Sequence, residues 1–154
     1  MKHAAKLVIA ALSASLAASA AFAATEFGTA KEAEALVGKA IAHIKAAGKD
    51  KAYATFMDKK GGFIDRDLFV SVIDMKGNIL VHGTSPSIVG KNLLEMKDPA
   101  GKLFIKERVD MAKTQSKFWQ DYTFFDPLTK KPLPKHSYCE KLNDTLVCTG
   151  TFSR

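Results

Sequence analysis

Cysteine is scarce in this 154-residue chain, which has only Cys139 and Cys148. There is no C-x-x-C motif and no base adjacent to either cysteine, which disfavours a redox catalyst. No lipobox cysteine follows the N-terminal apolar segment, which disfavours a lipid anchor. The chain also lacks internal repeats and a linker, so a single folded domain is expected.

Long apolar runs are absent after residue 23, although a membrane span needs about 20 strongly apolar residues. Residues 1–23 start with the basic stretch MKHAAK, continue as an alanine-rich apolar segment and end in the A-x-A pattern Ala21-Phe22-Ala23. This order predicts a signal peptide over 1–23, cleaved after Ala23, and one domain over 24–154. A retained amphipathic anchor is the alternative. We therefore expect a periplasmic protein without stable membrane insertion.

Catalytic and metal-binding signatures are also missing. The stretch GTSPSIVGKN (83–92) departs from a phosphate-binding loop, because Ser85 stands where glycine is needed and Asn92 follows Lys91. There is no nucleophile elbow, no H-E-x-x-H and no calcium loop. We expect no catalytic residues, no bound metal and no cofactor.

The net charge is positive, +7 for the whole chain. Cleavage after Ala23 removes Lys2 and Lys6 and leaves +5. Export and the scattered lysines argue against nucleic acid as a partner. A positive field favours small anions instead.

The two cysteines flank the turn residues Asn143-Asp144. A two-residue hairpin loop there would place Cys139 opposite Cys148, in a compartment where disulfides persist. We predict a disulfide across a hairpin. The alternative is a metal site made of His136, Cys139 and Cys148.

The periodicity of the chain predicts an α+β fold. Helices are expected over 29–47, 50–57 and 101–115, with Thr29-Ala30-Lys31-Glu32 as a capping box and Asp50 capping the second helix. Strands are expected over 67–74, 78–82, 117–125 and in a hairpin over 136–152, with connections over 83–100 and 126–135. One five-stranded antiparallel sheet would carry the long helix on one face and the 83–100 loop with its helix on the other. A ligand pocket would lie under that loop.

Four segments resemble the single Cache domains of bacterial extracytoplasmic sensing, in particular the stand-alone periplasmic Cache_2 type. They are LFVSVIDMKGNILVHG, VGKNLLEMKDPAGKLFIKERVDMAK, WQDYTFFDPLTKKPLPKHSYCEKL and CTGTF. The resemblance implies a PAS-like fold that binds a short organic acid such as acetate, propionate or pyruvate. It also implies that the signal passes to another protein.

A small carboxylate requires a cation or several hydrogen-bond donors. The candidate ligand-binding residues are His82, Trp119, Tyr122, Lys135 and Tyr138. Trp119 and Tyr122 are three apart, as are Lys135 and Tyr138, so each pair would point to opposite faces of a regular strand. Which member of each pair faces the pocket stays open, and a structural role is the alternative for each residue.

The resulting hypothesis is a non-catalytic periplasmic protein that binds a short organic acid and reports to a membrane sensor kinase or chemoreceptor. One alternative is an envelope interaction or structural module with a vestigial pocket. Another is a metal- or haem-binding carrier that uses His82, His136 or Met96.

Overall fold

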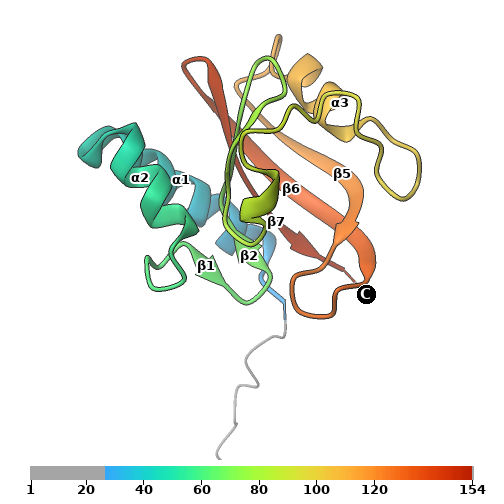
Figure 1. The fold of residues 1–154 in the computed structure, drawn as a ribbon, viewed down its shortest axis with the longest axis horizontal. Helices are drawn as coiled ribbons and strands as arrows, with labels where there is room; N and C mark the ends of the chain where they lie inside the picture. Colours follow the sequence, from blue (N-terminus) through green and yellow to red (C-terminus); the bar gives the residue numbers. More distant parts are fainter. Residues whose placement is uncertain (1–26, 154) are drawn as a thin grey trace, which may run out of the picture.

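The computed structural model describes residues 27–153, and the predicted signal peptide lies outside them. Two helices come first, and seven strands, a short 3-10 helix and a third helix follow (Figure 1). The helices are α1 (Ala30–Ala47), α2 (Lys49–Met57), η1 (Pro86–Ile88) and α3 (Phe104–Met111). The strands are β1 (Ile64–Asp65), β2 (Leu68–Phe69), β3 (Ser71–Asp74), β4 (Ile79–His82), β5 (Lys117–Phe125), β6 (Pro132–Leu142) and β7 (Thr145–Phe152).

The main sheet has five antiparallel strands in the order β4-β3-β7-β6-β5, so β7 is central and β5 is an edge. Helices α1 and α2 lie on one side of this sheet, and α3 with the connection that precedes it lies on the other (Figure 1). The predicted α+β, PAS-like architecture with a covering loop and helix is confirmed.

The predicted capping box begins α1. Thr29 accepts a hydrogen bond from the Glu32 amide, and the Glu32 carboxylate accepts one from the Thr29 amide. The helix ends at Gly48, whose φ of 82° suits glycine. The prediction that Asp50 caps the second helix is wrong, because α2 begins at Lys49 directly after Gly48 and Asp50 lies in its first turn.

The predicted strand 67–74 is interrupted at Val70. Its first part, β2, pairs with β1 in a separate two-stranded sheet, and its second part, β3, joins the main sheet. The buried carboxylate of Asp67 explains the break, because it accepts hydrogen bonds from the amides of Gly28 (2.5 Å) and Phe152 (2.8 Å). These contacts fix the chain before β2 to the beginning of α1 and the end of β7.

Strand β6 begins at Pro132, earlier than the predicted hairpin start at 136. Residues 132–134 pair with β5 alone, residues 135–140 pair with both β5 and β7, and residues 141–142 pair with β7 alone. Proline is tolerated where a strand has a neighbour on one side only. The strand therefore runs through Lys135 with its side chains alternating regularly between the two faces.

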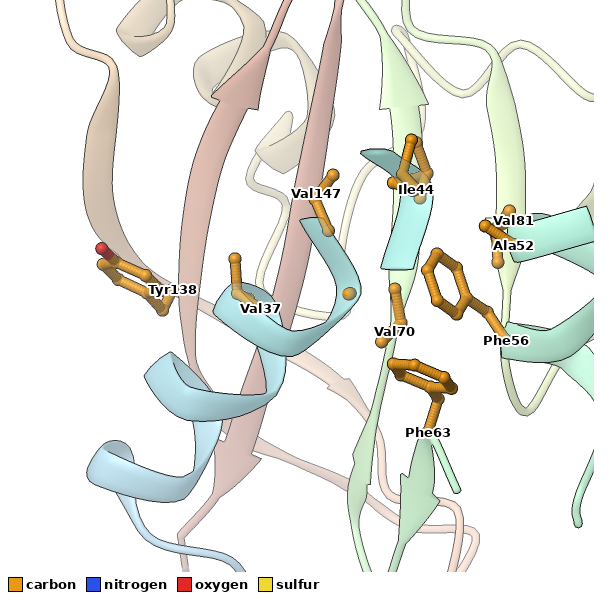
Figure 2. Packing of buried hydrophobic residues seen from close by; sticks show 11 residues of the cluster. Val37, Ile44, Ala52, Phe56, Phe63, Val70, Val81, Tyr138 and Val147 are labelled. Atoms are coloured by element: carbon orange, nitrogen blue, oxygen red, sulfur yellow. The ribbon is translucent and has the colours of Figure 1, made fainter. Parts of the chain in front are cut away.

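Two hydrophobic cores lie on the two faces of the sheet. The core under α1 and α2 includes Val37, Phe56, Phe63 and Val147 (Figure 2). The other core packs α3 against the sheet through Phe104, Ile105, Val109, Phe118 and Leu146. Burial on both faces fixes the direction of every side chain on β5, β6 and β7, because a shift by one residue would reverse all of them.

The disulfide lies in the second core. Cys139 and Cys148 are directly opposite in the β6–β7 register, their Cα atoms are 4.2 Å apart, and a disulfide joins them. The hairpin loop is Asn143-Asp144, as predicted. Both cysteines are buried beneath α3.

Candidate functional site

A small cavity lies between the sheet and its α3-side cover. Its free volume is about 20 Å³, which is room for roughly one water molecule. Strands β2 to β6, η1 and α3 all contribute to its walls. The polar lining residues are Ser71, His82, Arg108, Tyr122 and Lys135, and the apolar ones are Phe69, Ile73, Ile79, Ile88, Leu93, Phe104, Ile105 and Phe124.

Lys135 projects from β6 into this cavity and is only 4% exposed. Its Nζ lies over the rings of Phe69 (3.9 Å to the centroid), Phe152 (4.6 Å) and Phe124 (6.0 Å). Burial lowers the pKa of Lys135 below its ordinary value. Within residues 27–153 the ammonium group forms no ion pair with a carboxylate, so its closest partners are ring faces, while Asp67 and Asp126 favour its charge from a greater distance.

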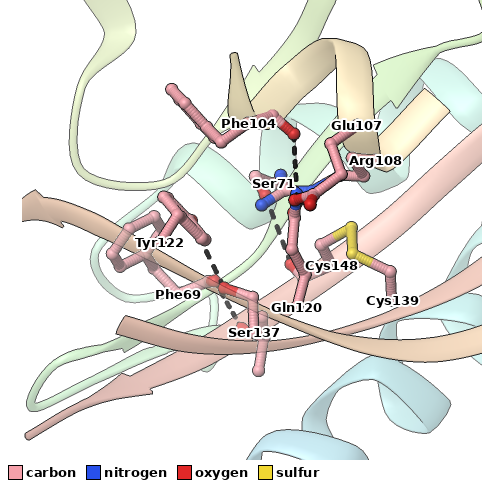
Figure 3. The surroundings of a disulfide bond; sticks show 11 residues. Phe69, Ser71, Phe104, Glu107, Arg108, Gln120, Tyr122, Ser137, Cys139 and Cys148 are labelled. Atoms are coloured by element: carbon pink, nitrogen blue, oxygen red, sulfur yellow. Dashed lines mark hydrogen bonds between the residues drawn. A yellow bond between two sulfur atoms is a disulfide. The ribbon is translucent and has the colours of Figure 1, made fainter. Parts of the chain in front are cut away.

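Arg108 supplies a second cation from α3 and is 2% exposed. Its Nε donates to Gln120 Oε1 at 2.9 Å, and the guanidinium lies over the ring of Tyr122 at 5.0 Å (Figure 3). Its Nη2 is buried, and no acceptor among residues 27–153 lies in hydrogen-bond geometry to it. A buried donor without a partner is costly, so this group has an unused capacity to bind an acceptor.

Tyr122 and His82 are the other titratable groups of the cavity. Burial alone would raise the pKa of Tyr122, but Lys135 and Arg108 outweigh it and lower this pKa to about 8. The Tyr122 oxygen accepts a hydrogen bond from Ser137 at 3.3 Å, so its own proton is free to be donated. Burial, reinforced by Lys135 and Arg108, lowers the pKa of His82 to about 3. His82 is therefore neutral at physiological pH, and its Nδ1 has no partner among the described residues.

Three of the five predicted ligand-binding residues meet at the cavity, namely His82, Tyr122 and Lys135. Trp119 and Tyr138 lie on the opposite face of the sheet, with the core under α1 and α2. They do not line the cavity, contrary to the prediction. The Trp119 ring stacks on His136 at 4.2 Å, and Tyr138 belongs to the core under α1 and donates to Glu140 at 2.9 Å. The unbroken alternation of β5 and β6 separates the members of each pair.

Arg108 was missed at the level of sequence. It follows Phe104 by four residues and Ile105 by three, so it lies on the face of α3 that those apolar residues define. That spacing was the available signal, because a cation on the buried face of a helix needs an explanation. Gln120 was also missed. It lies two residues before Tyr122 on β5 and therefore on the same face of the strand, and this alternation was the available signal.

The residues of the alternative metal site do not come together. Cys139 and Cys148 are bonded to each other, and His136 points to the other face of β6, where its Nδ1 lies 2.5 Å from Asp121 Oδ1. Over the described range 27–153, no three His, Cys, Asp or Glu side chains cluster in a way that could hold a metal ion.

The cover of the cavity is bonded to the β3–β4 hairpin. Main-chain hydrogen bonds join Ile79 N to Lys91 O (2.9 Å), Gly90 N to Ile79 O (2.7 Å) and Leu93 N to Gly77 O (2.9 Å). Residues 90–93 therefore protect the edge of β4. Next to the cavity, a surface groove of about 300 Å³ runs between residues 84–88 and 124–130, and it shares the walls Ile88 and Phe124 with the cavity.

An antiparallel five-stranded sheet with helices on one face and a cationic cavity under a loop and helix on the other is a PAS-like fold. Residues 2–152 match the family model for the single Cache domain 2, and the chain belongs to this family. Cache domains are periplasmic sensory modules that bind ligands. Among the described helices, none combines the length and apolar character that a membrane span requires.

Solved structures show the same fold. A methyl-accepting chemotaxis protein from Vibrio parahaemolyticus RIMD 2210633 is 24% identical, with a TM-score of 0.70 over 79% of this chain and 86% of that one. The periplasmic sensor domain of a chemotaxis protein is 23% identical (TM-score 0.61, 80% and 90%). A Cache chemosensory domain whose structure is described as explaining carboxylic acid recognition is 19% identical, with a TM-score of 0.65 over 80% of this chain and 88% of that one. No curated protein matches the chain.

Proposed function

We propose that this protein binds a short organic acid in the cavity and reports its presence without changing it chemically. The observation that carries the proposal is the pair of buried cations, Arg108 and Lys135, which line one cavity without a carboxylate partner in residues 27–153. Such charges are costly to bury alone, and an anion that entered the cavity would balance them.

The chemistry of the cavity supports a carboxylate. Arg108 Nη2 and Lys135 Nζ can donate to the two oxygens of a carboxylate, and the Tyr122 hydroxyl can add a third hydrogen bond. The aromatic and aliphatic walls suit a short apolar tail. The small free volume limits the ligand to acids of the size of acetate, propionate or pyruvate, and even these require the walls to move outward. The resemblance to a Cache domain described as recognising carboxylic acids agrees with this class.

The site of action in this proposal is the periplasm, reached after cleavage of residues 1–23. The partner that detects the ligand-bound protein would be a membrane sensor kinase or a chemoreceptor. The similarity of the fold to sensor domains of chemotaxis proteins supports this partner class. The absence of catalytic motifs supports binding without catalysis.

A thermal-shift screen of short carboxylates tests the proposal. A ligand present at 100 times its Kd stabilises the native state by about 2.7 kcal/mol. The shift should be strongly reduced, but still measurable, in Arg108→Met and unchanged in a control, Lys45→Met, whose side chain is exposed on α1. If acetate, propionate, pyruvate and longer acids all leave the melting temperature unchanged at millimolar concentration, the binding function is refuted.

The small free volume favours a second candidate, an interaction module of the envelope with a vestigial pocket. Phe125 and Leu128, at the end of the β5–β6 hairpin, are 56% and 48% exposed and are the large apolar side chains such a surface would use. This function would be supported if the carboxylate screen failed and Phe125→Ser abolished self-association or co-purification with an envelope protein.

A further inference from the structure

Gln120 is a buried polar residue of β5 that contacts α3, and it is 3% exposed. All of its side-chain hydrogen bonds go to α3 (Figure 3). Its Oε1 accepts from Arg108 Nε at 2.9 Å, and its Nε2 donates to the Phe104 carbonyl at 2.8 Å and to Glu107 Oε2 at 2.6 Å. One amide thus contacts three residues of the same helical turn.

The amide fixes Arg108 without cancelling its charge. The bond to Nε fixes the plane of the guanidinium group, and Nη2 is left without an acceptor beside the cavity. A carboxylate in this position would accept the same bond, but it would also neutralise the cation. A glutamine is therefore the residue type that holds an arginine and preserves its full attraction for an external anion.

The same amide also binds the carboxylate of Glu107, the residue before Arg108. Glu107 precedes Arg108 on α3, and Glu107 Oε2 is engaged by Gln120 Nε2 and by Lys102 Nζ at 2.8 Å. Burial would raise the pKa of Glu107, but the hydrogen bonds from Gln120 and Lys102 lower it below its ordinary value. The Glu107 carboxylate is thus engaged by two other donors and forms no ion pair with Arg108 among the described residues, although the two charges still attract each other.

We propose that Gln120 is a positioning residue of the acid-binding site: it orients Arg108 through Nε, restrains Glu107, and so presents Nη2 as a donor to the ligand carboxylate. This inference rests on the proposed function. The preference for anions would then depend on a residue that does not line the cavity and does not contact the ligand.

Binding measurements on a double-mutant cycle separate this role from simple packing. Gln120→Met keeps the length of the side chain but removes its hydrogen bonds. Calorimetric titration with acetate, propionate and pyruvate should show at least about tenfold weaker binding in Gln120→Met, the cost of one charge-assisted hydrogen bond. In an Arg108→Met background, Gln120→Met should have no further effect on affinity. Gln115→Met, at an exposed site, is the matched control.

Gln120→Glu is a second variant that retains an acceptor for Nε. It should bind the acids at least about tenfold more weakly than the wild type, because its carboxylate neutralises Arg108. Wild-type affinity in Gln120→Glu would overturn the proposal. So would an equal loss of affinity from Gln120→Met with and without Arg108, because that result would mean that Gln120 acts only through packing.

A readout without ligand distinguishes failure of this inference from failure of the proposed function. The chain has three arginines, at positions 66, 108 and 154, so the Arg108 Nε–H signal can be assigned in a nitrogen-15 spectrum by its loss in Arg108→Met. The Nε–H signal should be protected from exchange with water in the wild type, and this protection should be lost in Gln120→Met. If no acid binds the wild type, the proposed function fails, and this signal alone decides whether Gln120 orients Arg108. Unchanged protection in Gln120→Met overturns that orientation.

Discussion

Mild acid should destabilise this protein through His82. Burial beside Lys135 and Arg108 lowers the pKa of His82 to about 3 in the folded state, whereas an unfolded histidine titrates near 6.5. The unfolded chain therefore binds more protons between these values. His82 therefore has no effect on stability well above pH 6.5, and it lowers the free energy of unfolding progressively as the pH falls from about 6.5 towards 3.

The size of this effect is insensitive to the exact folded pKa. Between pH 7.5 and 5.0 the loss in unfolding free energy from this one group is about 2 kcal/mol, provided that the folded pKa is below about 4.5. His82 is 6% exposed, so solvent screening takes little from this value.

Urea denaturation of the wild type and of His82→Gln at the two pH values measures the contribution. The wild type should lose about 2 kcal/mol more than the variant over this interval. The buffer at pH 5.0 should contain no carboxylate, because acetate is itself a proposed ligand. Equal losses in the two proteins would refute the reasoning, since His82 would then be able to ionise in the folded state.

Three further predictions concern stability. Cys139→Ala combined with Cys148→Ala should lower the unfolding free energy by about 2.5–3 kcal/mol, the chain-entropy value for a loop of about ten residues, and reductant should have no effect on the variant in the same urea assay. Lys135→Met should raise the melting temperature of the ligand-free protein, because it removes an unpaired buried cation, while it abolishes any shift by carboxylates; a lower melting temperature would contradict this account. Gly77→Ala should cost more than about 1 kcal/mol and more than Gly90→Ala, because both glycines have a φ of 84° but only a methyl group at 77 would contact the covering loop; equal costs by urea denaturation would show that the contact is harmless.

Most of the fold follows from local patterns. The capping box at Thr29 predicted the beginning of α1, and the two-residue turn at Asn143-Asp144 predicted the register that joins Cys139 to Cys148. The break at Val70 did not follow, because Asp67 is held by residues far away in the chain. Helix α3 is also shorter than predicted, since Asp98 accepts hydrogen bonds from the amides of Ala100 and Lys102 and keeps that segment in a turn.

The candidate site was only partly accessible to sequence reasoning. Strand alternation established that Trp119 and Tyr122 face opposite ways, but it did not decide which of them faces α3. That choice depends on the packing of Phe118 and Cys139 in the second core, which is a tertiary property. Arg108 was recoverable from the spacing of α3, whereas its contact with Gln120 joins two elements whose relative position no local pattern specifies.

The hydrogen bonds between residues 90–93 and the β3–β4 hairpin have a kinetic consequence. They join that part of the cover to the sheet, whereas on another side Ile88 and Phe124 line both the cavity and the outer groove. A bulky side chain that separates two such spaces slows the entry and the exit of a small molecule by the same factor. If the protein binds an acid as proposed, residence time would depend on Ile88 and Phe124, and affinity on the buried charges of Arg108 and Lys135.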